Sequence, residues 1–90
     1  MITIYILKLA DGTHYTGITK DLSRRMSEHN RGKCRYTHDK LPFSIIHTEE
    51  KENYKTAATL ERHIKNTGAK RYLKNLELKK LFGNQFVYVQ

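Results

Sequence analysis

The sequence predicts an α+β fold: a small three-stranded, mostly antiparallel sheet flanked by helices in the order β-β-α-β-α-α. Two runs rich in β-branched and aromatic residues, Ile2–Leu9 and Thr13–Thr19, are joined by an Asp-Gly turn, which is typical of an antiparallel hairpin. Three later segments carry helical start and stop signals, and a further apolar run separates the first two of them. A chain of 90 residues has room for one such domain.

Between the hairpin and the middle of the chain, the sequence predicts a helix, a loop and a strand. Asp21 is a suitable N-cap for a helix over residues 22–30, and Gly32 lies just past its end. Residues 31–42 are polar and basic and predict a long loop that ends in the single proline. The apolar run 43–48 then predicts the third strand.

The second half predicts two helices. An acidic run, residues 49–52, follows the third strand, and Asn53 can cap a helix over residues 54–66. A glycine separates it from a third helix over residues 69–82. We expect residues 1–82 to form the domain and the apolar tail 83–90 to pack on it or extend it.

The composition points to a polyanionic partner. Lys and Arg number 17 against 9 Asp and Glu, which gives a formal charge of +8 and favours nucleic acid over an anionic membrane surface. The single cysteine, Cys34, excludes an internal disulfide framework and a multi-cysteine zinc site, and it fits a cytoplasmic or nucleoid location. No apolar stretch is long enough to cross a bilayer, and the N-terminus lacks the layout of a signal peptide.

Two charged residues fall on the apolar faces of predicted helices. Leu22 and Met26 define the buried stripe of the first helix, and both Arg25 and His29 lie on it. Glu61 lies in the same way within the buried stripe of the second helix, where its carboxylate needs a cation: Arg25, a lysine or a metal ion. Arg25 can keep its charged head in water at the edge of the stripe, or it can form a structural ion pair with Glu61. In a basic chain, the two residues also predict a shared polar site on one face of the sheet.

The hairpin contributes two tyrosines and a glycine. Strand tyrosines usually serve packing, and whether Tyr5 and Tyr15 share a face depends on the turn. A two-residue loop puts them on opposite faces, whereas a three-residue loop with a bulge pairs Ala10 with His14 and puts them on the same face. Gly17, inside the second strand, indicates a close approach of backbone or ligand.

These residues, in this order, resemble the GIY-YIG nuclease family and are most similar to its short stand-alone bacterial members. Thr3-Ile4-Tyr5 resembles the first motif of the family, and Tyr15-Thr16-Gly17 resembles the second. Arg25 follows Tyr15 by ten residues, as the arginine of the family does. Glu61, in a Glu-x-x-Ile-Lys setting, resembles the metal-binding glutamate, and the likeness covers about residues 3–75.

Two positions depart from the family pattern, and one further position of the pattern has two possible matches in this sequence. Thr3 replaces the glycine of the first motif and Thr16 the isoleucine of the second, as in close relatives, so neither change removes a catalytic group. Asn66 and Asn75 are both candidates for the later asparagine of the family.

The resemblance implies a metal-dependent DNA endonuclease that hydrolyses phosphodiester bonds and is structure-selective or weakly sequence-specific. Glu61 would hold a single Mg²⁺ or Mn²⁺, and no small-molecule cofactor is expected. Arg25 would bind the scissile phosphate, and Tyr5 or Tyr15, with a slight preference for Tyr15, would take the proton from water. Arg25, the metal and the basic surroundings would lower the pKa of that phenol. His29 would orient a group or contact phosphate, or simply cap its helix.

Two basic segments, residues 20–40 and 61–82, predict a track for DNA phosphates. The DNA-binding candidates within them are Lys20, Arg24, Arg31, Lys33, Arg35 and Lys65. Tyr36 can stack on an unpaired base or pack against the protein. Branched, nicked and single-stranded DNA all remain open as substrates, and we expect a role in DNA repair and a monomer or weak dimer. The alternatives are a DNA-binding module of the same fold with little or no cleavage and a basic protein-interaction adaptor.

Overall fold

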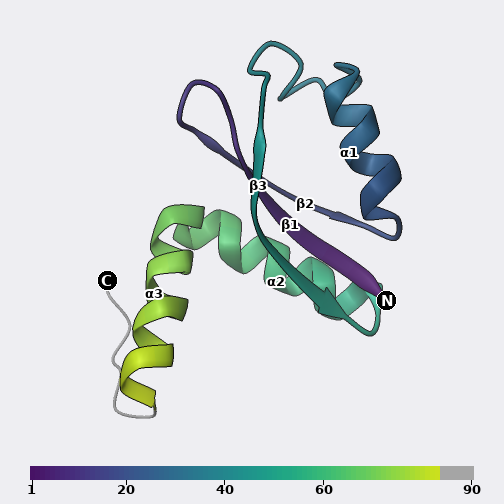
Figure 1. Cartoon of the computed structure of the whole chain (residues 1–90). Coiled ribbons are helices and arrows are strands. Elements are labelled where there is room, and N and C mark those ends of the chain that lie inside the picture. The colour runs from purple at the N-terminus through teal and green to yellow at the C-terminus, as the bar shows by residue number, and fades with distance from the viewer. Residues whose placement is uncertain (84–90) are drawn as a thin grey trace.

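A computed structural model gives the arrangement of residues 1–83, and residues 84–90, which hold most of the predicted tail, lie outside the described residues. The predicted element order is confirmed (Figure 1). The elements are β1 (Ile2–Lys8), β2 (His14–Thr19), α1 (Leu22–Asn30), β3 (Ser44–Lys51), α2 (Tyr54–Thr67) and α3 (Ala69–Phe82).

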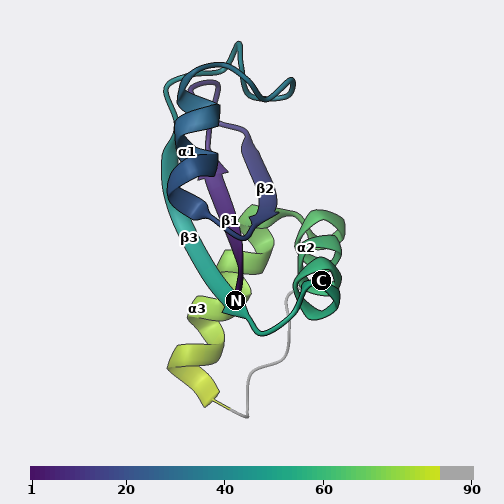
Figure 2. The same cartoon turned by 90° about the vertical axis from the view of Figure 1, so that its right-hand side faces the viewer.

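The three strands form one antiparallel sheet in the order β2-β1-β3, with β1 at its centre. The helices lie on both sides of the sheet: α1 on one face and α2 on the other (Figure 2). Helix α3 packs against α2 and continues beyond the end of the sheet (Figure 1). Among the described residues, no helix combines the length and the apolarity that a membrane crossing requires.

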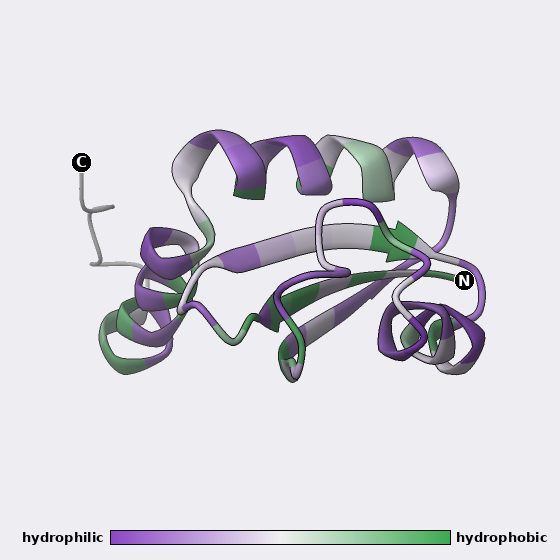
Figure 3. Ribbon diagram, turned by 90° about the horizontal axis from the view of Figure 1, so that it is seen from above, coloured by the Kyte–Doolittle hydropathy of each residue, from purple (hydrophilic) through white to green (hydrophobic). Residues whose placement is uncertain are grey.

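Alternate residues of β1 supply two separate cores. Ile2, Ile4 and Ile6 point toward α2, where they pack with buried Ala57 and Ile64. On the other face, residues 5, 7 and 9 pack with partly buried side chains of α1. Colouring by hydropathy shows hydrophobic residues in the sheet between the helices, whereas α1 is largely hydrophilic (Figure 3). The α2 side is therefore the main apolar core, because fully burying each isoleucine contributes roughly 1.5–3 kcal/mol.

The hairpin loop places Tyr5 and Tyr15 on the same face of the sheet. Leu9 N–H donates to the carbonyl of Thr13 at 2.8 Å, which leaves three loop residues, 10–12. Gly12 adopts a φ of 86°, a conformation that favours glycine. The same-face alternative is therefore correct, but the pairing expected for it is wrong by two residues, because His14 pairs with Lys8 and not with Ala10.

Gly17 lies directly opposite Tyr5 in the β1–β2 ladder. A Cβ atom at this position would lie 2.6 Å from Cζ of Tyr5 and 3.1 Å from Cε2 of Tyr15, and it would collide with the Tyr5 hydroxyl. The glycine therefore lets the Tyr5 ring lie across β2, and the predicted close approach is that of a side chain.

The third strand is longer than predicted, because it continues through the acidic run to Lys51. Residues 49–51 pair with the first residues of β1. β3 is an edge strand, so the carboxylate of Glu50 stays exposed. Glu49 is half-buried and accepts hydrogen bonds from Tyr72 and from His47, which offsets its poor strand propensity.

The predicted N-caps of α1 and α2 are confirmed. Asp21 Oδ1 accepts a hydrogen bond from Arg24 N–H at 3.0 Å, and Asn53 Oδ1 accepts one from Thr56 N–H at 2.9 Å. These caps satisfy backbone donors that have no partner within the helix. The cap at Asp21 matters for the site because it fixes where α1 begins, and hence which way its polar residues face.

The contact between Gly17 and Tyr5 predicts a strong coupling between these positions. Gly17→Ala should lower the free energy of unfolding by about 1–3 kcal/mol, because the ring of Tyr5 must move. In a Tyr5→Leu background, which removes the hydroxyl and Cζ, the same substitution should be neutral or stabilising, because alanine suits a strand better than glycine. Urea denaturation of all four proteins measures this coupling, and an equal loss in both backgrounds would contradict the assignment.

Candidate active site

The hydroxyl of Tyr5 is the centre of a buried polar cluster on the α1 face. Tyr5 is 1% exposed, and its Oη lies 3.0 Å from Nε2 of His29. Arg25 donates from Nε to the same oxygen at 3.3 Å. The central strand and the first helix thus bring three of the predicted site residues into contact.

Helix α1 positions the arginine and the histidine. Arg25 and His29 are one turn apart, so both project toward the sheet from the same face of α1. Glu28 accepts a hydrogen bond from Nη1 of Arg25 at 2.9 Å, which holds the guanidinium beside the helix. This bond and the one to Tyr5 raise the pKa of Arg25 above its ordinary value, so the arginine stays charged.

Tyr15 stands next to the cluster but is more open than Tyr5. Its ring centroid lies 6.2 Å from that of Tyr5 and 5.3 Å from that of His29. On the outer side, the ring of Tyr36 lies 5.7 Å away at 32°. Tyr15 is half-buried and lines a hollow at the edge of the sheet, so a molecule from solvent can reach it.

Burial dominates the acid–base properties of this cluster. It raises the pKa of Tyr5 to about 12, although the hydrogen bond from Arg25 acts in the opposite direction. It also raises the pKa of Tyr15, with a further contribution from Cys34 and again with opposition from Arg25. Burial, followed by the charge of Arg25, lowers the pKa of His29, which is therefore neutral at pH 7. Arg25 thus lowers the pKa of both phenols, as expected, but burial raises these pKa values by more.

Glu61 does not join this cluster. It lies on α2, on the opposite side of the sheet, and its Oε2 is 3.4 Å from Nζ of Lys65. Arg25 pairs with Glu28 instead. The predicted structural ion pair between Arg25 and Glu61, and a shared polar site on one face of the sheet, are therefore both wrong. The reason is that α1 and α2 cover different faces, which the spacing of residues along the chain does not reveal.

The two sides of the sheet meet at the edge formed by β2, which is an outer strand among residues 1–83. A hollow of about 370 Å³ lies there, lined by Tyr15 and Tyr36 from the α1 side and by Lys65 and Gly68 from the end of α2. Glu61 precedes Lys65 by one helical turn and shares its face of α2. The glutamate thus lies on the helix face that borders the hollow.

The chemistry of Glu61 fits a hard divalent cation. Its side chain is 22% exposed, and the ion pair with Lys65 involves Oε2 alone. A carboxylate oxygen is a ligand that Mg²⁺ prefers, and this ion commonly keeps several waters. Within residues 1–83, no group of three or more His, Cys, Asp or Glu side chains is arranged to hold a metal. Any ion on Glu61 would therefore be coordinated largely by water and by substrate.

The predicted DNA-binding residues are all exposed. They are Lys20, Arg24, Arg31, Lys33, Arg35 and Lys65. Tyr36 is 49% exposed, and Nζ of Lys40 lies 4.6 Å from its ring centroid, so the ring already has one cationic neighbour. Of the two asparagine candidates, Asn66 is exposed and Asn75 is buried within α3.

Three neighbours of the cluster were not predicted as site residues. Glu28 could have been recognised, because it follows Arg25 by three positions on the same helix. Cys34 and Thr37 belong to the loop after α1, and both are buried. Their inward direction has no sequence signal, because loop residues carry no periodicity.

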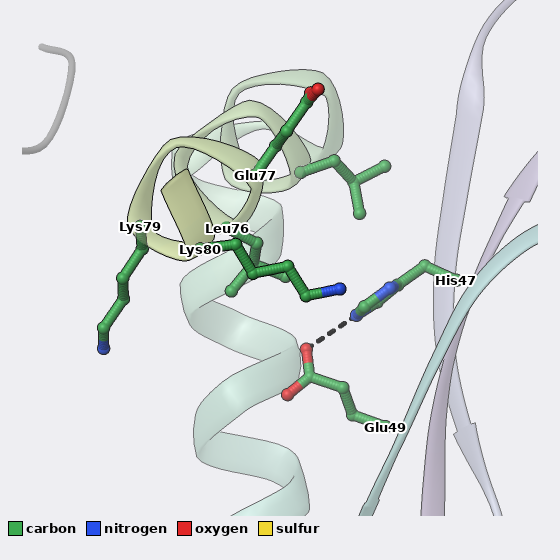
Figure 4. Close-up of a pocket in the computed structure, with 7 residues that line it drawn as sticks. His47, Glu49, Leu76, Glu77, Lys79 and Lys80 are labelled. Atoms are coloured by element: carbon green, nitrogen blue, oxygen red, sulfur yellow. Dashed lines mark hydrogen bonds and ion pairs between the residues drawn. The ribbon is translucent and has the colours of Figure 1, made fainter. Parts of the chain in front are cut away.

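A second hollow, of about 660 Å³, lies between β3 and α3 (Figure 4). His47 and Glu49 project into it from β3 and are joined at 2.8 Å, while Lys80 approaches from α3. It is larger than the hollow at β2, but its lining includes neither of the two motif tyrosines nor Arg25. The residue chemistry therefore places the candidate active site at the β2 edge.

Curated relatives of similar length resemble this chain. A UPF0213 protein of Halobacterium salinarum is 40% identical over 63 residues, which cover 69% of this chain and 82% of the relative. A UPF0213 protein of Listeria innocua is 39% identical over 67 residues, 73% of this chain and 74% of the relative. The solution NMR structure of a UPF0213 protein from Bacillus halodurans matches with a TM-score of 0.52 and 32% identity, over 93% of this chain and 88% of that one.

The family model of the GIY-YIG catalytic domain matches residues 1–75. This range contains the buried tyrosine cluster, the hollow at β2 and Glu61. The match spans all elements except the last part of α3. The chain therefore belongs to the GIY-YIG family, which is a family of nuclease domains.

Proposed function

We propose that this protein is a metal-dependent endonuclease that hydrolyses phosphodiester bonds in DNA. The observation that carries the proposal is the fixed arrangement of Arg25, Tyr5 and His29 beside the accessible Tyr15. A buried polar cluster of this kind is more than stability needs, because an apolar core would do as well. Because no helix of residues 1–83 resembles a base-reading helix, the enzyme is structure-selective or weakly sequence-specific.

Arg25 is the group that binds the scissile phosphate. Its guanidinium is held at two points, by Tyr5 through Nε and by Glu28 through Nη1. Its side chain is 29% exposed, so part of the planar donor fork can still reach a phosphate from solvent. Because the guanidinium is oriented before substrate binds, it stabilises the extra negative charge of the transition state without reorganisation.

Tyr15 is the general base. The hydroxyl of Tyr5 is buried and already contacts Arg25 and His29, so an attacking water has no access to it. Tyr15 lines the open hollow and stands within the electrostatic reach of Arg25. Tyr5 then acts as the support that fixes Arg25 and the neighbouring ring.

Glu61 holds the divalent ion, Mg²⁺ or Mn²⁺, one helical turn before Lys65, which lines the same hollow. When bound, such an ion supplies positive charge that stabilises the leaving oxygen and makes a nearby phenol more acidic. The ion pair with Lys65 keeps the Glu61 carboxylate oriented along α2. Lys65 also lines the hollow, where its ammonium group can contact a neighbouring phosphate.

The exposed basic residues determine how DNA would be oriented across the site. Exposed cations lie on and after α1, on one side of the hollow, and on α2, on the other. DNA that passes over the β2 edge would place consecutive phosphates between these two groups. This binding should weaken by orders of magnitude between low and high salt, whereas a protein-interaction adaptor would bind nucleic acid with little salt dependence.

The site assignment predicts which variants lose cleavage. With supercoiled plasmid and Mg²⁺ or Mn²⁺, Arg25→Ala should reduce the nicking rate by about 10²-fold or more, because an oriented charge at the transition state is lost. Glu61→Gln should lose the metal-dependent activity, because the amide is a much poorer ligand for the ion. Gel electrophoresis of time courses measures both effects.

Matched controls for this experiment are Lys8→Ala and Glu52→Gln, both at exposed positions outside the two basic segments, which should stay within about threefold of the wild type. Nicking that persists in Arg25→Ala and Glu61→Gln would refute the assignment. Salt-dependent DNA binding without cleavage in the wild type would instead favour the binding-module alternative.

The raised pKa of Tyr15 predicts a pH dependence of the rate. Its phenolate, the basic form, is scarce at pH 7 and increases about tenfold for each pH unit below the pKa of the phenol in the substrate complex. The logarithm of kcat should therefore rise with a slope close to 1 from pH 6.5 upward. Tyr15→Phe should abolish this activity, whereas Tyr54→Phe, at an exposed tyrosine, should preserve both rate and slope. A rate independent of pH over this range would exclude a phenol as the base.

A further inference from the structure

A threonine of the loop after α1 is fully buried against the candidate active site. Thr37 is 0% exposed, and its Oγ1 lies 2.8 Å from Nδ1 of His29. The backbone around it is held in a tight turn, because its N–H donates to Cys34 and its carbonyl accepts from Lys40. The hydroxyl is therefore presented to the histidine by a fixed backbone and not by a mobile loop.

The hydrogen bonds around Tyr5 determine which nitrogen of His29 carries the proton. Nε of Arg25 can only donate, so Oη of Tyr5 accepts this bond. The phenol is neutral at pH 7, and its buried proton needs an acceptor, which the described contacts supply at Nε2 of His29. A neutral imidazole that accepts at Nε2 carries its proton on Nδ1.

The proton on Nδ1 points to Thr37. Its hydroxyl oxygen is the partner of this nitrogen at 2.8 Å and accepts the bond. Thr37 in turn interacts with the Cys34 thiol, whose pKa is lowered because hydrogen bonds, among them one from Thr37, outweigh the effect of burial. Because this oxygen accepts from His29, the hydroxyl proton of Thr37 points away from Nδ1.

We propose that Thr37 is a positioning residue of the active site: by accepting the Nδ1 proton of His29, it fixes the tautomer that accepts the Tyr5 proton and so orients Tyr5 and Arg25. This inference rests on the proposed function for its effect on cleavage. Thr37 does not line the hollow, and its side-chain hydrogen bond is with His29, so it acts through the histidine. A threonine that only filled space would be replaceable by valine.

The test compares Thr37→Val, which keeps the shape and loses the hydroxyl, with Thr37→Ser, which keeps the hydroxyl. Thr48→Val, at an exposed strand position, is the matched control. The first readout is the tautomer of His29 at pH 7.5, from the ¹⁵N chemical shifts of the two ring nitrogens. We expect a protonated Nδ1 in the wild type, in Thr37→Ser and in the control, and a protonated Nε2 in Thr37→Val.

The second readout is plasmid cleavage. Thr37→Val should lower kcat by about tenfold with KM within about twofold, because Arg25 and Tyr5 lose their orientation in the transition state, and Thr37→Ser should recover the rate. A wild type protonated on Nε2, or a Thr37→Val protein with the wild-type tautomer and rate, would overturn the proposal. If Thr37→Val does not fold, the proposal is tested by two remaining measurements. The wild type must be protonated on Nδ1 of His29, and Thr37→Ser must keep both this tautomer and the wild-type rate; failure of either would overturn the proposal. If the wild type cleaves no DNA, the proposed function fails, and the tautomer alone decides the role of Thr37.

Discussion

The burial of one phenol hydroxyl is the constraint on which the candidate active site depends. Tyr5 lies in the central strand, where every neighbour is packed, so its hydroxyl must find partners inside the protein. Gly17 leaves the room for it across β2, and α1 supplies Arg25 and His29 from successive turns. The same hydroxyl thereby fixes the direction of a charged guanidinium, which is the group that the proposed chemistry needs.

The sheet itself decides where that chemistry can take place. Arg25 and Glu61 belong to helices on opposite faces, so they can act on one phosphate only around the β2 edge. Within residues 1–83 no further strand pairs with β2 on its outer side, and Tyr15 and Lys65 line one hollow there although they come from different sides of the sheet. An edge strand without a partner is usually a risk for aggregation. In this protein, the β2 edge is where a polyanion such as DNA can contact residues from both faces of the sheet.

Much of the fold could be predicted from the sequence because its signals are local. The Asp-Gly turn, the caps Asp21 and Asn53 and the helix bounds depend on neighbouring residues. The end of β3 could not be predicted, because Glu49 is stabilised by Tyr72, a distant residue. For the site, the spacing of Tyr5, Tyr15 and Arg25 pointed to a family, but the geometry needs the loop register and the sides on which the helices pack. Those are tertiary properties, and for this reason the expected contact between Arg25 and Glu61 was wrong.

The two faces of β1 have different roles: one contributes most of the apolar core, and the other carries the residues of the candidate active site. Isoleucines at alternate positions bury one face against α2 and α3 and form the main apolar core. The intervening positions can therefore carry a tyrosine whose hydroxyl, arginine and histidine contacts would be a poor way to build a core. In a domain this small, such a division has a direct consequence: conservative changes in the polar cluster leave the larger core intact. The loss of an activity in those variants can then be attributed to the site and not to unfolding.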